Sequence, residues 1–275
     1  MSVFTLERPQ LCLITDPTVP NLPEIVEVAA ASGVTMLQVR GHQLSAADLY
    51  ALAMQLRPYC QQYEVALIVN DRLDVGLAVE ADGFQLGKRS LPLRAARQVV
   101  GTRYLLGASV HSLQEAQAAI TEGADFLLAG TIFASSSHPG EPTSGPDLLR
   151  EIKQMYPTCF LLAIGGITAA NAKQAMQAGA DGVAVISAIL HARDVQRAVT
   201  EFYDMLKETI TILANGQTRM SKAGSTVADL LQELNIKPTY VVVQLDGEIV
   251  PRTAFAQAAL REGSKVEIIT LAGGG

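Results

Sequence analysis

Short apolar segments alternate with longer segments of helical periodicity through the first 209 residues of this 275-residue chain. The apolar segments are not interrupted by alternating polar residues, which is typical of strands covered on both faces in a parallel sheet. Eight such segments occur: Leu11–Thr15, Met36–Arg40, Ala66–Asn70, Gly83–Gly87, Tyr104–Val110, Phe126–Thr131, Cys159–Gly165 and Gly182–Ser187. Eight strand–helix units in about 200 residues predict an α/β fold, a (β/α)8 or TIM barrel. An open doubly wound sheet is the alternative, but the chain has no Gly-x-Gly-x-x-Gly motif.

The joints between predicted helices and strands carry a repeated motif. Gly-Ala-Asp occurs at 123–125 and at 179–181, and Glu-Ala-Asp at 80–82 is a close variant. Each triplet stands between a helical segment and the next strand, so we expect one type of joint to recur around the barrel. Ser112 and Glu115 form a capping-box pattern, which predicts that a helix begins after Ser112.

The last 66 residues have a different pattern. Asn215-Gly216 separates two short strand-like segments and is a strong hairpin signal. An amphipathic helix is expected over Thr226–Leu234, followed by strands at Tyr240–Leu245 and Lys265–Leu271. Residues 210–275 hold six Lys/Arg and six Asp/Glu, so the chain's net charge of −6 falls on the part before them. We therefore predict a barrel domain over 1–209 and a small α+β domain over 210–275.

Composition narrows the class of protein. With 49% hydrophobic and 17% charged residues, the chain has an ordinary globular composition. Net negative charge argues against a nucleic-acid partner, and no apolar segment approaches the roughly 20 residues of a membrane span. We see no export signal, and the three cysteines have no metal-ligand spacing, so we expect a cytoplasmic protein without a structural metal. The oligomeric state is left open, a homo-oligomer included.

The chain ends in three glycines, Gly273, Gly274 and Gly275. A frayed terminus is the ordinary explanation, but a tail without side chains can also enter a narrow catalytic channel and present its carboxylate there. Residues 210–275 resemble ThiS, the ubiquitin-like (β-grasp) sulfur carrier of thiamine biosynthesis, most specifically in Ile249–Arg252 and the tail. The resemblance implies a C-terminal thiocarboxylate, with thiazole synthase and a sulfur-carrier adenylyltransferase as partners. Such carriers normally end in two glycines, so Gly275 is either activated directly or trimmed first.

Two predicted strands of the barrel end in segments suited to phosphate. Strand seven ends at Gly165-Gly166 and strand eight at Ile186-Ser187. Barrel active sites lie at the C-terminal ends of the strands, and the loops after strands seven and eight often bind phosphate through backbone N–H groups. A tight turn that binds nothing is the alternative. We favour a phosphate site.

Residues 11–206 resemble the thiamine phosphate synthase family and its sister group, the TenI-type thiazole tautomerases. The matching segments are Leu13–Asp16, Gln38–Arg40, Val69–Arg72, Gly107–Ser112, Ala163–Ile167 and Gly179–Ser187. Both groups share them. The resemblance therefore implies one of two activities. A synthase joins a pyrimidine pyrophosphate to a thiazole phosphate with Mg²⁺, whereas a tautomerase aromatises a carboxythiazole phosphate without a cofactor.

Departures from the synthase pattern cluster at the pyrophosphate subsite. Asp71 matches the first aspartate of that pattern, but Ser90 stands in place of the second. His42 and His138 stand where the pattern has lysines. A neutral imidazole is a poor substitute for a fixed positive charge against a polyanion. The sequence therefore favours the tautomerase, although Lys88 and Arg89 could supply positive charge for a synthase.

The tautomerase interpretation assigns roles to particular residues. His111 is the candidate general base, and Arg40 the candidate for bidentate binding of the substrate carboxylate. As alternatives, His111 caps the following helix or fills the barrel mouth, and Arg40 forms a structural ion pair with an acid such as Asp71. Asp71 itself could serve only to cap the next helix. His138 and Glu141 lie in the loop Ala134–Pro146, for which a lid and an ordinary solvated loop are equal alternatives. Further pocket candidates are Gln38, Asn70, Asp71, Ser109 and Gly145.

The leading hypothesis is thus a thiazole tautomerase barrel fused to a sulfur carrier. One rival is a thiamine phosphate synthase with a rebuilt pyrophosphate site. The other is a degenerate, non-catalytic barrel that merely presents the carrier.

Overall fold

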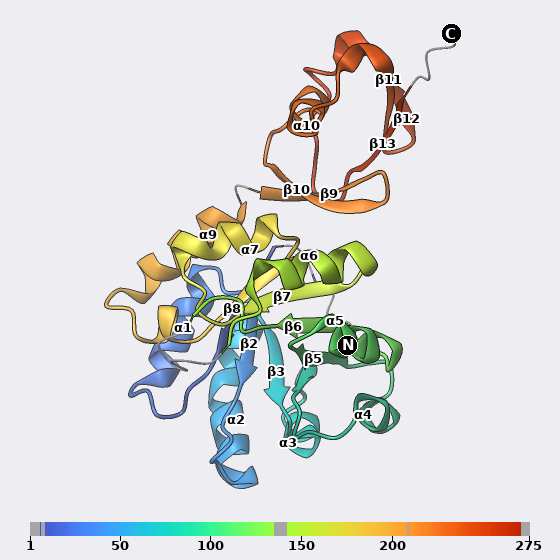
Figure 1. Ribbon diagram of the computed structural model, residues 1–275. Helices are drawn as coiled ribbons and strands as arrows, with labels where there is room; N and C mark the ends of the chain where they lie inside the picture. The colour runs from blue at the N-terminus through green and yellow to red at the C-terminus, as the bar shows by residue number, and fades with distance from the viewer. Residues whose placement is uncertain (1–5, 7–8, 135–141, 208, 271–275) are drawn as a thin grey trace.

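The computed structural model describes residues 6, 9–134, 142–207 and 209–270. Its larger part is a closed barrel in which each strand pairs in parallel with the next, and β8 pairs with β1 (Figure 1). The strands are β1 (Gln10–Ile14), β2 (Met36–Val39), β3 (Ala66–Asn70), β4 (Gly83–Leu86), β5 (Leu105–Val110), β6 (Phe126–Ala129), β7 (Phe160–Ile164) and β8 (Gly182–Val185). The prediction of a TIM barrel is confirmed.

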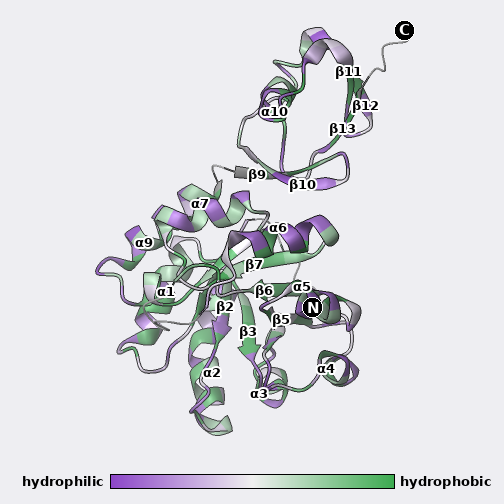
Figure 2. Ribbon diagram, viewed as in Figure 1, coloured by the Kyte–Doolittle hydropathy of each residue, from purple (hydrophilic) through white to green (hydrophobic). Residues whose placement is uncertain are grey.

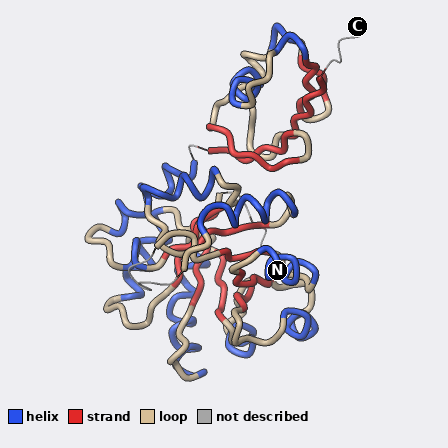
Figure 3. Tube along the Cα trace, in the orientation of Figure 1, coloured by secondary structure: helices blue, strands red, loops and turns tan. Residues whose placement is uncertain are grey.

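Helices surround the barrel and cover the outer face of its strands, which explains why polar and apolar residues do not alternate along them. They are α1 (Leu22–Ser32), α2 (Ala46–Gln62), α3 (Leu73–Ala78), α4 (Leu93–Val100), α5 (Leu113–Thr121), α6 (Gly145–Met155), α7 (Ala169–Gln177), α8 (Ser187–Leu190) and α9 (Val195–Lys207). Figure 3 shows these helices in blue outside the red strands. In Figure 2 the strands are mainly hydrophobic, and the outer helices carry the hydrophilic residues. No helix within the described ranges is both long enough and apolar enough to span a membrane.

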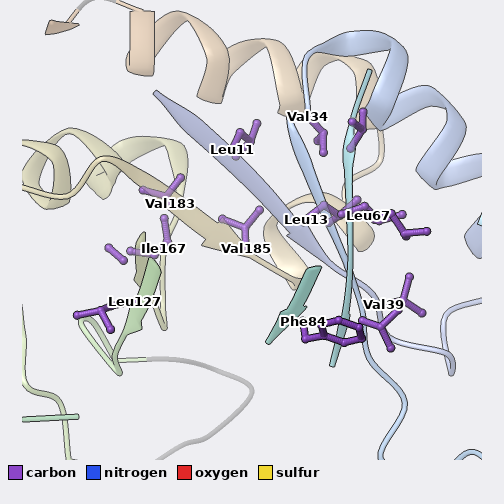
Figure 4. Close-up of a cluster of buried hydrophobic side chains, with 14 of the residues drawn as sticks. Leu11, Leu13, Val34, Val39, Leu67, Phe84, Leu127, Ile167, Val183 and Val185 are labelled. Carbon is purple, nitrogen blue, oxygen red and sulfur yellow. The ribbon is translucent and has the colours of Figure 1, made fainter. Parts of the chain in front are cut away.

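Both faces of the barrel strands are buried. Side chains such as Leu11, Leu13 and Leu67 point outward into a core shared with the helices (Figure 4). Met36 and Phe126, together with neighbours from other strands, form a second cluster, because successive strand residues point to opposite sides. Strands buried on both sides need apolar residues at every position, and this requirement made them recognisable in the sequence.

The three aspartates of the repeated triplets make the same contact. Each accepts a hydrogen bond from the backbone N–H near the start of the preceding strand: Leu67 N to Asp82, Leu106 N to Asp125 and Leu161 N to Asp181, at 2.8, 2.7 and 2.8 Å. Asp181 is completely buried and pairs with Lys153, whose Nζ lies 2.6 Å from its Oδ2. The predicted repetition of the joint is thus present at the N-terminal end of the barrel.

The start of α5 departs from the expected capping box. Ser112 Oγ accepts a hydrogen bond from Glu115 N at 3.2 Å, as predicted. The Glu115 carboxylate, however, accepts from His111 N at 2.7 Å rather than from the N–H of Ser112. The glutamate therefore fixes the backbone of a candidate site residue instead of closing the box.

A five-stranded sheet in the order β10-β9-β13-β11-β12 follows the barrel. Its elements are β9 (Thr209–Ala214), β10 (Gln217–Lys222), α10 (Val227–Glu233), β11 (Val241–Leu245), β12 (Glu248–Val250) and β13 (Lys265–Thr270), with short 3-10 helices at Pro238–Tyr240 and Arg252–Ala254. Asn215 and Gly216 have φ values of 49° and 72°, which confirms the predicted hairpin turn. The strand β12 was not predicted, because it has only three residues, two of them exposed.

The small domain lies against the N-terminal end of the barrel. Its strand β10 contacts α6 and α7. Thr218 Oγ1 donates a hydrogen bond to the carbonyl of Pro157, just before β7, at 2.7 Å. The small domain therefore packs against the N-terminal end of the barrel. It leaves the C-terminal ends of the barrel strands uncovered.

Candidate functional site

A cavity of about 560 Å³ lies at the C-terminal ends of the barrel strands. All eight strands or the residues just after them contribute to its lining. Among the predicted site residues, Gln38, Arg40, Asn70, Asp71, Ser109, His111, Gly165, Gly166, Ile186 and Ser187 line this cavity. Gly145 does not line it and instead begins α6. His138, Glu141 and the tail residues Gly273, Gly274 and Gly275 lie outside the described residues.

A network of hydrogen bonds fixes the carboxylate of Asp71 at the end of β3. Gln38 Nε2 donates to Asn70 Oδ1 at 2.7 Å, and Asn70 Nδ2 donates to Asp71 Oδ2 at 2.6 Å. On the other carboxylate oxygen, Asp71 accepts a hydrogen bond from Ser90 Oγ. Asp71 does not cap the next helix, because the N-cap of α3 is Arg72 and that cap has no side-chain hydrogen bond. The Asp71 carboxylate is held toward the cavity instead.

Arg40 does not pair directly with Asp71, contrary to the structural alternative drawn from the sequence. Its Nε donates to His42 Nε2 at 2.8 Å, and His42 Nδ1 lies 3.4 Å from Asp71 Oδ2. Partial burial, together with the nearby charge of Arg40, lowers the pKa of His42 below its ordinary value of 6.5. His42 also lines the cavity, although the sequence identified it only as a missing lysine.

His111, at the end of β5, is held through both its backbone and its ring. Its ring Nδ1 lies 2.5 Å from the carbonyl oxygen of Gly130. Because a carbonyl only accepts, Nδ1 must carry the proton, and the lone pair of the neutral ring is on Nε2. The backbone N–H of His111 is bound by Glu115, which pairs with Lys88 at 3.1 Å. This arrangement leaves one basic nitrogen on an accessible ring.

The opposite side of the cavity is built from backbone. Gly165 and Gly166 have φ values of 96° and 60°. A Cβ would stand 2.5 Å from Thr131 Cγ2 at the first glycine and 2.3 Å from the carbonyl oxygen of Ala134 at the second. Within the described part of the chain, the N–H groups of Gly166 and Ser187 bond to no protein acceptor. Such free N–H groups before helices can bind a phosphate.

The cysteines are placed as core residues. Burial raises the pKa of the Cys12 and Cys60 thiols to about 12, so both stay protonated at neutral pH. Neither these two nor Cys159 lines the cavity. Among the residues that the structure describes, no group of three or more His, Cys, Asp or Glu side chains could hold a metal ion by itself.

Comparisons with known proteins divide the chain in the same way. Residues 11–189 match the family model described as thiamine monophosphate synthase, and residues 206–275 match the ThiS family. The thiamine-phosphate synthase of Methanospirillum hungatei is 39% identical over 66% of this chain and 89% of its own. That of Chloroflexus aurantiacus is 41% identical over 67% and 85%. The solved thiamine phosphate pyrophosphorylase of Pyrococcus furiosus is 36% identical, covers 73% of this chain and 96% of its own, and superposes with a TM-score of 0.67.

Proposed function

Since the chain belongs to the thiamine monophosphate synthase family, an enzyme family of thiamine biosynthesis, we propose that its barrel is a thiamine-phosphate synthase. The barrel then joins a pyrimidine pyrophosphate to a thiazole phosphate and releases pyrophosphate. Two curated relatives named above carry this activity in their names. Their similarity reverses the order of preference drawn from the sequence, which placed the tautomerase first.

The observation that supports this function most is the presence of two separate places for anions on opposite sides of one cavity. Arg40 follows β2 and Arg89 follows β4, whereas the free N–H groups of Gly166 and Ser187 follow β7 and β8. In a closed barrel of eight strands, β3 and β4 face β7 and β8. A synthase must hold two phosphorylated substrates with their reacting ends together between the anion sites. We assign the pyrophosphate to the Arg40 side and the thiazole phosphate to the glycine side.

The residues around Asp71 fit a magnesium ion only if the substrate completes its shell. Mg²⁺ commonly takes one or two carboxylates together with phosphate oxygens and water. Asp71 and the Ser90 hydroxyl that donates to it would supply two oxygen ligands, and the pyrophosphate would supply others. Bound there, Mg²⁺ would neutralise charge on the departing pyrophosphate. Ser90 is thus a weaker ligand than the aspartate of the synthase pattern, but not an incompatible one.

The protein's own task in this reaction is binding and orientation. The thiazole nitrogen forms a bond to the pyrimidine methylene carbon with its lone pair, while the carbon–oxygen bond to pyrophosphate breaks. No proton needs to leave the thiazole nitrogen, so this step requires no general base. Arg40 and Arg89 hold the negatively charged leaving group, and Arg89 has no acidic partner within the described ranges. The free N–H groups at Gly166 and Ser187 hold the phosphate of the second substrate.

A specific observation keeps thiazole tautomerase as a second candidate function. His111 is fixed in the tautomer whose Nε2 is basic, and this is what a proton shift requires. The substrate of that reaction carries a phosphate and a carboxylate, which would occupy the same two anion sites. The tautomerase would need neither Mg²⁺ nor the Asp71 carboxylate.

One assay panel distinguishes the two functions. We expect the purified chain to form thiamine phosphate from the pyrimidine pyrophosphate and thiazole phosphate in the presence of Mg²⁺. The reaction should stop when a chelator removes Mg²⁺. His111→Ala should change this rate little, because the synthase step uses no base. If the chain instead aromatises the thiazole tautomer, forms no thiamine phosphate and loses about 10²–10⁴-fold in rate on His111→Ala, the tautomerase is the correct function.

For the small domain we propose the role of a sulfur carrier. Its match to the ThiS family and its terminal glycines support a C-terminal thiocarboxylate. With a sulfur-carrier adenylyltransferase, ATP and a sulfur donor, we expect intact-protein mass spectrometry to show one oxygen replaced by sulfur. A variant that ends at Ala272 is the control and should stay unmodified. If the wild-type mass is also unchanged, the carrier role is wrong, whatever the barrel does.

A further inference from the structure

His42 connects the two functional side chains on the pyrophosphate side of the cavity. Its ring stands between them, with Nε2 at 2.8 Å from Arg40 Nε and Nδ1 at 3.4 Å from Asp71 Oδ2. The three residues come from the ends of two neighbouring strands, β2 and β3. About a third of the His42 side chain is exposed, and Asp71 is more buried at 23% exposure. Direct contact between Arg40 and Asp71 is therefore replaced by an imidazole bridge.

The chemistry of the contacts determines the form of the ring. An arginine Nε–H can only donate, so His42 Nε2 must be the unprotonated nitrogen. The proton of the neutral ring is then on Nδ1, the nitrogen that faces the Asp71 carboxylate. A positively charged His42 would place an N–H against the N–H of Arg40 and lose the hydrogen bond. The arrangement thus works only with a neutral imidazole.

Using Nε for this bond has a consequence for Arg40. A guanidinium binds an oxyanion in a bidentate manner through either its Nε–Nη edge or its Nη1–Nη2 edge. His42 occupies the first edge, and no acid within the described residues pairs with Arg40. The second edge is left for a ligand in the cavity that Arg40 lines.

We propose that His42 is a positioning residue, which holds Arg40 so that its Nη1–Nη2 edge binds the oxyanion of the substrate. The synthase pattern has a lysine at this position, which would add a second positive charge beside Arg40. His42 instead holds the guanidinium of Arg40 in place. This inference deepens the proposed function, because the oxyanion in question is the pyrophosphate of the first substrate.

The first test reads the tautomer without any assay of activity. In the full-length protein labelled with ¹⁵N, the ring nitrogens of His42 are identified by their loss in His42→Gln. At pH 7.5 we expect Nδ1 to have the chemical shift of a protonated nitrogen and Nε2 that of an unprotonated one. The opposite tautomer, or a doubly protonated ring, would overturn the proposal.

The second test measures binding of inorganic pyrophosphate by calorimetry. Freeing the Arg40 side chain should cost about tenfold in affinity in His42→Ala. His42→Gln should restore most of it, since the glutamine carbonyl can accept from Arg40 Nε. Equal affinity in wild type and His42→Ala, with circular dichroism confirming that both are folded, contradicts the positioning role.

Kinetics then separate this inference from the proposed function. If the chain is a synthase, His42→Ala should raise KM for the pyrimidine pyrophosphate more than it lowers kcat, and His42→Gln should recover KM. If the predicted tautomer and pyrophosphate affinities are found but no thiamine phosphate forms, the proposed function fails and the role of His42 stands. An altered kcat with an unchanged KM would refute the inference even in an active synthase.

Discussion

Replacing Lys153 by methionine is expected to lower the free energy of unfolding of the barrel by about 3–5 kcal/mol. Lys153 is only 4% exposed, and its Nζ lies 2.6 Å from the fully buried Asp181. Methionine keeps most of the apolar stem but removes the Lys153 ammonium group from the buried carboxylate. Asp181 also accepts a hydrogen bond from the N–H of Leu161, so the loss affects the start of β7 as well. Urea unfolding followed by far-UV circular dichroism measures the difference.

The matched control is Arg57→Met, which removes the cation from the more exposed pair between Arg57 and Glu80. Partly exposed ion pairs contribute little, so this variant should lose about 1 kcal/mol or less. If Lys153→Met is no more destabilising than Arg57→Met, the buried pair does not stabilise the joint before β8. A loss in both variants of several kcal/mol would point instead to the packing of the long side chains.

Replacing Asp71 by asparagine should reduce kcat/KM for thiamine phosphate formation by about 10³-fold or more. The variant loses the charged ligand for Mg²⁺, whose stabilisation of developing charge is worth several kcal/mol. It also disturbs the hydrogen bonds that Asn70 and Ser90 donate to the two carboxylate oxygens, because an amide has only one acceptor oxygen. Steady-state kinetics over a range of Mg²⁺ concentrations would show both a lower rate and a higher metal requirement.

Asp74→Asn provides the control for that experiment. Asp74 is three residues away, pairs with Arg72 and does not line the cavity. Its loss should leave kcat/KM and the Mg²⁺ requirement close to wild type. Should Asp71→Asn retain full magnesium-dependent synthesis, the metal must be held elsewhere and the assignment of Asp71 is wrong. Retained aromatisation of the thiazole tautomer in Asp71→Asn would be the expected result for the second candidate function.

The barrel could be predicted from sequence because its strands are buried on both faces. Segments such as Phe160–Ile164 consist of apolar residues alone, and only a two-sided burial explains such a pattern in a short strand. The strand Glu248–Val250 could not be recognised in the same way. It lies at the edge of the small sheet, and its exposed residues carry no hydrophobic pattern.

The candidate site was predictable in its location but not in its contacts. Barrel topology brings every strand end to one mouth, so residues such as Arg40 and His111 could be placed there from their sequence positions. The sequence offered no signal that Ser90 would bond to Asp71, 19 residues earlier, or that the imidazole of His42 would separate Asp71 from Arg40. These contacts depend on side-chain directions in the loops after the strands, which periodicity does not determine.

The small domain sits at the base of the barrel, and this has a consequence for how the two halves cooperate. Strand β10 contacts α6 and α7, whereas the cavity opens at the other end of the strands. A protein bound to the outer face of the small domain would therefore leave the barrel mouth open to small molecules. The proposed sulfur delivery and the proposed ring synthesis would then not compete for one site on the molecule. Because both domains are parts of one chain, the two proposed activities are always present in equal numbers.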